Sequence, residues 1–118
     1  MTKAESAYNL LLMLSVIDGE IDDIEREVIK SWIDSKYDSS VDFEKQDQAL
    51  AKLSSDELLE QFHASAQKYY EESEPTERRQ LMQTALHVVQ SDGVISKEEV
   101  QIFKGLADVW GVDMQQFM

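Results

Sequence analysis

Residues 18–25 read Asp-Gly-Glu-Ile-Asp-Asp-Ile-Glu, and residues 92–99 read Asp-Gly-Val-Ile-Ser-Lys-Glu-Glu. In both copies, Asp-Gly is followed by an isoleucine, then by a good helix N-cap, and then by a glutamate three residues after that cap. This order is typical of a capping box at the start of a helix. Glycine ends a preceding helix readily because it adopts a positive φ, so each copy predicts a helical hairpin. The two cap–glutamate pairs are Asp22 with Glu25 and Ser96 with Glu99.

The similarity extends well beyond the two turns. Laying residues 4–36 over residues 78–110 keeps charges, turns and apolar positions in register without a gap, so that Val28, for example, falls on Ile102. Such self-similarity predicts a duplicated hairpin. The two hairpins are expected to pack around a pseudo-twofold axis, and residues 42–72 are expected to supply the central helices between them.

The remaining sequence also favours helix, because it has one proline, four glycines and few β-branched runs. Capping boxes, a proline at a first helical position and a terminal glycine mark the helix ends. The predicted fold is all-α: a single-domain helical bundle of about six helices over residues 1–118, with two pseudo-symmetric helical hairpins and central helices inserted. The expected helices are Thr2–Ile17, Asp22–Lys36, Asp42–Leu53, Ser54–Glu72, Pro75–Ser91 and Ser96–Gly111, with a last short turn at Asp113 and Gln116.

Composition restricts the function and the partners. The chain has no cysteine, which excludes disulfides, zinc-thiolate sites and thiol catalysis. Its longest apolar run is far shorter than the roughly 20 residues that span a bilayer, and no signal peptide precedes it, so a cytoplasmic protein is expected. The net charge is −13. That charge disfavours nucleic acid and favours cations or a basic protein partner, although it also serves ordinary solubility. Peripheral membrane association and the oligomeric state are left open.

The acidic turns invite comparison with a calcium-binding EF-hand loop. If Gly19 takes loop position six, then Asp18, Asp22 and Glu25 fall on positions five, nine and twelve. However, Leu14 then takes position one, where calcium needs an oxygen ligand, and the second copy has the same defect. An ordinary calcium sensor is therefore disfavoured.

A family resemblance follows from these features. An aliphatic helix, then Asp-Gly-x-Ile, then a glutamate four residues on, present twice with a central helical insert, resembles the TerB-like domain. That family includes tellurite-resistance proteins and the N-terminal domain of a membrane-anchored DnaJ-type co-chaperone. The resemblance covers most of the chain and implies an all-helical bundle, a role in stress response, and acidic turn residues that chelate a metal. Carried over to this sequence, those residues are Asp18, Glu25, Asp92 and Glu99, with Asp22 as a further carboxylate of the first turn.

The same acidic residues have a purely structural interpretation. An aspartate before glycine can bond local backbone donors, and a glutamate in the first helical turn is explained by capping and by the helix dipole. If a cation does bind, ligands that are all carboxylates favour calcium, magnesium or manganese over zinc. Both interpretations are kept, with capping as the favoured one.

Other side chains offer less chemistry. His87 aligns with Met13, so it is expected to be half-buried in the core, and Trp32 and Trp110 are expected to pack there as well. Tyr69 or Tyr70 is expected to be partly exposed as an interface anchor. The pair Arg78-Arg79 is expected to face the acidic residues Glu71, Glu72, Glu74 and Glu77.

No catalytic or cofactor-binding residue is predicted, because the sequence has no nucleophile elbow and no phosphate-binding loop. The expected function is a non-enzymatic interaction or scaffold module. The alternative is a divalent-cation sensor that uses the paired turns. A weaker alternative is a hydrolase whose carboxylates hold a metal cluster.

Overall fold

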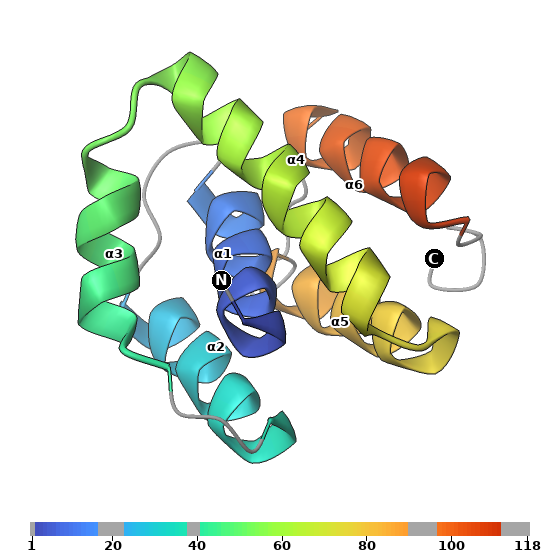
Figure 1. The fold of residues 1–118 in the computed structure, drawn as a ribbon, viewed down its shortest axis with the longest axis horizontal. Helices are drawn as coiled ribbons and strands as arrows, with labels where there is room; N and C mark the ends of the chain where they lie inside the picture. Colours follow the sequence, from blue (N-terminus) through green and yellow to red (C-terminus); the bar gives the residue numbers. More distant parts are fainter. Residues whose placement is uncertain (1, 17–22, 38–40, 90–96, 112–118) are drawn as a thin grey trace.

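The fold was analysed in a computed structural model, which describes residues 2–16, 23–37, 41–89 and 97–111. These residues form six helices and no strand, which confirms the predicted all-α class (Figure 1). The predicted turn at Asp113 and Gln116 lies outside the described residues. The helices are α1 (Lys3–Val16), α2 (Asp23–Lys36), α3 (Phe43–Ala51), α4 (Ser55–Glu72), α5 (Pro75–Val89) and α6 (Lys97–Trp110).

Helix starts follow the local capping chemistry. Thr2 and Glu5 bond each other's backbone N–H reciprocally, at 2.8 and 3.1 Å, and Ser54 with Glu57 forms the same box at the start of α4. The Asp42 side chain accepts the backbone N–H of Lys45 to cap α3. Each of these caps satisfies a donor that an open helix end would leave unpaired. At the other end of the chain, Gly111 follows α6 with φ +66°, the left-handed conformation that glycine tolerates best.

Helix α1 is the centre of the molecule (Figure 1). Leu10, Leu11 and Leu14 are fully buried, as is the aromatic ring of Tyr8 on the same helix. Every residue of α1 from Ser6 to Leu14 is buried, so this helix must be surrounded by other elements. Helix α1 meets this requirement by packing against α2, α4, α5 and α6.

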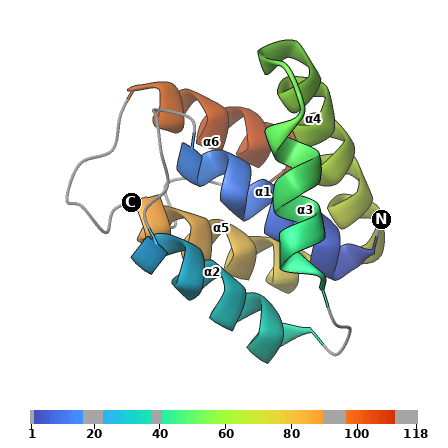
Figure 2. The same cartoon turned by 90° about the vertical axis from the view of Figure 1, so that its left-hand side faces the viewer.

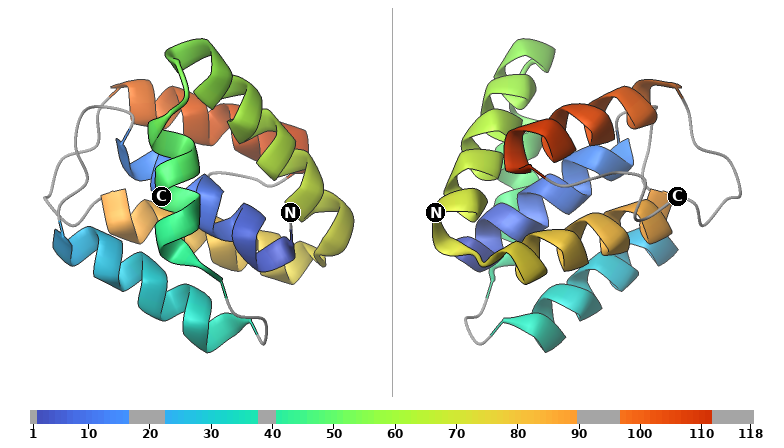
Figure 3. Two further views of the ribbon diagram at one scale, coloured as in Figure 1. Left: turned by 60° about the vertical axis from the view of Figure 1, so that its left-hand side comes forward. Right: turned by 90° about the vertical axis from the view of Figure 1, so that its right-hand side faces the viewer.

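The two hairpins are arranged pseudo-symmetrically. α1 packs on α2 and α5 on α6, while α1 also touches α6 and α2 touches α5, so exchanging the hairpins preserves the pattern. Lys3 and Glu77, which are equivalent positions of the repeat, form a 2.9 Å ion pair. Equivalent residues can touch only near the axis that relates them. The axis therefore passes between the first turns of α1 and α5, which run side by side in the same direction (Figures 2 and 3).

The inserted helices cover one side of α1. Helix α4 packs along α1. It also contacts α6, where the indole Nε1 of Trp110 donates to the carbonyl oxygen of Ala66 at 3.1 Å. The rings of Tyr69 and Trp110 lie 5.4 Å apart, centroid to centroid. Helix α3 reaches α1 through Phe43, whose ring packs 4.8 Å from that of Tyr8.

A short chain of hydrogen bonds joins the end of α2 to α4 and α5. The hydroxyl oxygens of Tyr37 and Tyr69 are 2.6 Å apart, and the Tyr69 hydroxyl donates to the backbone carbonyl of Glu77 at 3.3 Å. Burial raises the pKa of Tyr69 to about 12 and raises that of Tyr37 well above its usual value. Both phenols therefore stay protonated and available as donors at neutral pH.

Three side-chain predictions need correction or refinement. Arg78 does not pair with the acidic side chains. Its Nη1 donates to the backbone carbonyls of Tyr70 and Ser73, so it caps the carboxyl end of α4. His87 is exposed, because none of the described helices covers its side of α5, whereas its repeat equivalent Met13 lies on the enclosed α1. Trp110 is buried as predicted, but Trp32 is only half-buried.

Candidate functional site

The predicted cation ligands fall where the structure gives no side-chain geometry. Asp18, Asp22 and Asp92 lie outside the described residues. Glu25 and Glu99 belong to the first turns of α2 and α6, but their side chains are outside the description as well. Cation binding by these five residues therefore stays a prediction. Among the residues that are described, no group of three or more His, Asp and Glu side chains could hold a metal ion.

The four helix ends that flank the two predicted turns lie at the same end of the molecule. The carboxyl ends of α1 and α5 and the amino ends of α2 and α6 lie together at one end, which is visible in two views (Figures 2 and 3). This follows from the parallel course of α1 and α5.

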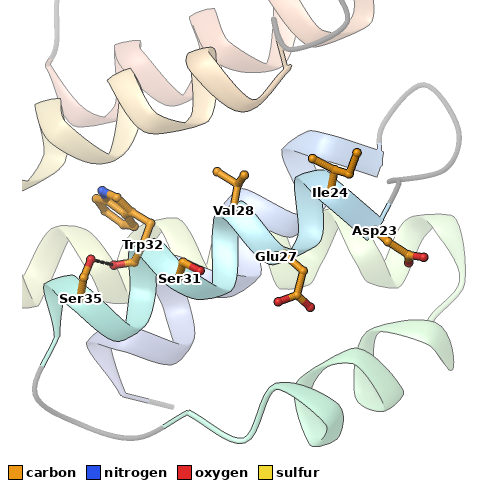
Figure 4. Close-up of a pocket in the computed structure, with 7 residues that line it drawn as sticks. All are labelled: Asp23, Ile24, Glu27, Val28, Ser31, Trp32 and Ser35. Carbon is orange, nitrogen blue, oxygen red and sulfur yellow. Dashed lines mark hydrogen bonds between the residues drawn. The ribbon is translucent and has the colours of Figure 1, made fainter.

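A second candidate site lies on α2. Seven residues line a shallow surface there, which we call the α2 face (Figure 4). Ile24 is 76% exposed and Val28 is 43% exposed, and Trp32 continues the same apolar stripe one turn further on. Exposed apolar side chains that adjoin one another are typical of a binding surface. The α2 face consists of Asp23, Ile24, Glu27, Val28, Ser31, Trp32 and Ser35.

The amino-acid order of α2 explains this exposure. Ile29 and Ile33 are fully buried and form the side of α2 that packs against the core, as expected of an amphipathic helix. Ile24, Val28 and Trp32, spaced four residues apart, form a second apolar stripe beside them, in which Trp32 packs partly against the core while Ile24 and Val28 are exposed. The sequence alone does not predict this site, because the repeat pattern favours a core position for Trp32 and indicates no role for Ile24. The unusual width of the apolar side was the available signal.

The charge on the α2 face is negative. The carboxylates of Asp23 and Glu27 line it and are exposed. Two basic residues of the same helix lie toward α3, because Arg26 pairs with Asp47 of α3 at 2.7 Å and the Lys30 ammonium lies 5.7 Å from the centre of the Phe43 ring. The surface is therefore an apolar stripe edged by acidic groups.

A related groove of about 510 Å³ lies between α4 and α6. Helix α4 contributes Phe62, Ala66 and the 53%-exposed Leu59, and α6 contributes Ile102 and the 60%-exposed Val109. His63 also lines this groove. This groove thus has one wall from α4 and one from α6, whereas the α2 face is formed by α2 alone. The groove is lined by Leu59, Phe62, His63, Ala66, Gln67, Gln101, Ile102, Gly105, Leu106 and Val109.

Comparison with known proteins gives one positive result. The family model described as tellurite resistance protein TerB matches residues 4–118, nearly the whole chain. Searches of curated proteins and of solved structures gave no match. Within the described residues, none of the helices is long and apolar enough to span a membrane.

Proposed function

This chain belongs to the TerB family of tellurite resistance proteins, and we propose that it is a non-enzymatic interaction module that binds a protein partner. The observation that carries the proposal is the α2 face, where Ile24 and Val28 are exposed beside the carboxylates of Asp23 and Glu27. An apolar patch with a polar rim is the usual form of a protein-binding surface.

Two further features support this function. The sequence has no cysteine, no nucleophile elbow and no phosphate-binding loop, which argues for binding rather than catalysis. The family description, tellurite resistance, supports a partner that belongs to a stress-response complex.

The test is the capture and reconstitution of a partner. The full chain, carrying a photo-activatable cross-linker on its surface, is expressed in its source cell, and cross-linked proteins are identified by mass spectrometry. Each candidate is then purified and titrated calorimetrically against the full chain. We expect saturable binding of at least one protein to the folded chain, with none to the chain unfolded in urea. Failure of every purified candidate to bind would overturn the proposal.

A second candidate function is divalent-cation binding at the paired turns. It is favoured by the gathering of the four helix ends that flank these turns (Figures 2 and 3). In this proposal Asp18, Asp22, Glu25, Asp92 and Glu99 supply carboxylate oxygens to a calcium, magnesium or manganese ion, which takes such hard ligands readily. The cation would join the two hairpins and stabilise the folded state by mass action.

Calorimetric titration with each ion tests the cation proposal. We expect heat and a rise in Tm at millimolar ion, and we expect both to disappear in the double variant D18N/D92N. The matched control is D34N, which removes an exposed carboxylate from α2 away from the turns. A double variant that loses stability in the presence of chelator would instead identify the aspartates as turn-forming residues.

A further inference from the structure

The α2 face and the α4–α6 groove involve the same side of two equivalent helices. Every α6 residue that lines the groove is the repeat equivalent of a residue of the α2 face. The correspondence continues over more than two turns of helix, so it reflects the duplication rather than one coincident pair. Gln101, Ile102, Gly105, Leu106 and Val109 correspond in order to Glu27, Val28, Ser31, Trp32 and Ser35.

In the second hairpin, α4 covers this side. Phe62 and Ala66 of α4 form the opposite wall, and Ala66 accepts the indole N–H of Trp110. The covering changes the burial: Leu106 is only 2% exposed, whereas its equivalent Trp32 is half-buried. Ile24 and Val28 of the α2 face are 76% and 43% exposed, so the described part of the chain leaves this face largely open (Figure 4). The second hairpin therefore shows which kind of element fits this side of the repeat, namely an amphipathic helix.

We infer that the α2 face docks an amphipathic helix of a basic protein partner, laid against α2 as α4 is laid against α6. This inference rests on the proposed interaction function and names its surface and its ligand. The geometry specifies apolar residues on one side of the partner helix, as Leu59, Phe62 and Ala66 are arranged on α4. Lysine or arginine beside them would meet Asp23 and Glu27.

Charge selects this occupant over a second copy of the chain. Two α2 faces brought together would place Asp23 and Glu27 of one copy against the same acidic edge of the other, within proteins that each carry a net charge of −13. Like charges brought together in this way oppose association.

The probe for the experiment follows from α4 itself. It is an 18-residue synthetic peptide with the sequence of residues 55–72, in which every aspartate and glutamate is replaced by lysine, carrying a fluorescent label. Its apolar side matches the helix that already covers α6, and its charge is reversed. Binding to the full-length chain is followed by fluorescence anisotropy. We expect saturable binding to the wild-type chain, and weaker binding of the same peptide with its natural acidic residues.

Variants locate the binding surface. The double variant I24Q/V28Q should weaken the peptide about tenfold or more, because it removes the two most exposed apolar groups of the α2 face. The matched control is L59Q/V109Q, which removes two similarly exposed apolar side chains from the other groove and should bind as wild type. E27K should also weaken binding, and D34K should do so less, since Asp34 does not line the face. Thermal melting confirms that each variant is folded.

The outcomes separate this inference from the proposed function. Wild-type affinity in I24Q/V28Q, absence of peptide binding, or loss of binding in L59Q/V109Q would each overturn the inference. Concentration-dependent dimerisation that I24Q/V28Q abolishes would overturn it too, because a second copy would then be the occupant. If a captured partner still binds I24Q/V28Q, the chain is still an interaction module, but the α2 face is not its binding site.

Discussion

Lys3 and Glu77 show what one contact on a pseudo-symmetry axis contributes. The hydrogen bond from Lys3 is the main reason that the pKa of the Glu77 carboxyl is lowered, and its bond to the backbone N–H of Glu74 adds to the effect. A carboxyl with a lower pKa in the folded state stabilises the fold above its unfolded pKa. That stabilisation is lost as the pH falls through the folded-state value.

We therefore expect E77Q to lower the free energy of unfolding at pH 7 by about 0.5–1 kcal/mol, the range of a partly exposed ion pair. The difference between wild type and variant should shrink as the pH falls below about 4. Urea unfolding at several pH values between 3 and 7 measures this. The control is E60Q, which removes an exposed carboxylate from α4. A difference that does not change with pH would show that Glu77 acts through packing alone.

Arg78 stabilises a helix end rather than an ion pair. Its Nη1 lies 2.6 Å from the carbonyl oxygen of Ser73 and 3.1 Å from that of Tyr70, and its guanidinium carbon lies 4.4 Å from the centre of the Tyr70 ring. R78M should therefore cost about 1–3 kcal/mol in urea unfolding, since it leaves these carbonyls without their charged donor. R79M, at the exposed neighbouring position, should stay within about 0.5 kcal/mol of wild type. Equal effects of the two substitutions would exclude the capping role.

At the scale of the helix, the two tryptophans differ by what lies over them. Trp110 of α6 is buried under α4 and donates to Ala66, whereas Trp32 of α2 is half-buried on the α2 face. W110F should lower stability by about 1–2 kcal/mol, because it removes the indole hydrogen bond to Ala66 and leaves a smaller ring in a buried place. W32F should cost less, because it keeps an aromatic ring at a partly exposed place. Denaturation followed by far-ultraviolet circular dichroism measures both without relying on tryptophan emission. A larger loss in W32F would contradict the assignment of α4 as the cover of α6.

The helices also show which features a sequence can predict. The box formed by Ser54 and Glu57 involves four consecutive residues, so the start of α4 is encoded locally and was predicted to within one residue. The role of Arg78 depends on a turn that brings the end of α4 back to α5, and the exposure of His87 depends on what covers α5. Neither can be found in a local pattern. The width of the apolar side of α2 was visible, but whether a second stripe is buried or free is decided only by the arrangement of the other helices.

At the scale of the whole molecule, the excess of acidic groups opposes folding. Twenty-four acidic and eleven basic residues give a net charge of −13. Among the described residues, the ion pairs Lys3–Glu77, Arg26–Asp47 and Lys68–Glu72 join partly exposed side chains. Repulsion among the unpaired carboxylates is larger in the compact state than in the unfolded chain. Salt screens such repulsion over distances of about 10 Å at 0.1 M ionic strength. The stability of this protein should therefore increase with salt.

Raising sodium chloride from 0.02 to about 0.3 M should raise Tm by several degrees through this screening alone. Magnesium or calcium chloride at the same ionic strength separates general screening from binding at the paired turns. If Asp18 and Asp92 bind a cation, the divalent salt should add a further increase that saturates, and D18N/D92N should lose this increase while it keeps the response to sodium. Scanning calorimetry at matched ionic strength measures both parts. A fall in Tm with sodium chloride would mean that favourable ion pairs such as Lys3–Glu77 outweigh the repulsion. If Tm rises identically with sodium and with magnesium chloride, the turns bind no divalent cation, and their carboxylates act only in capping the helices.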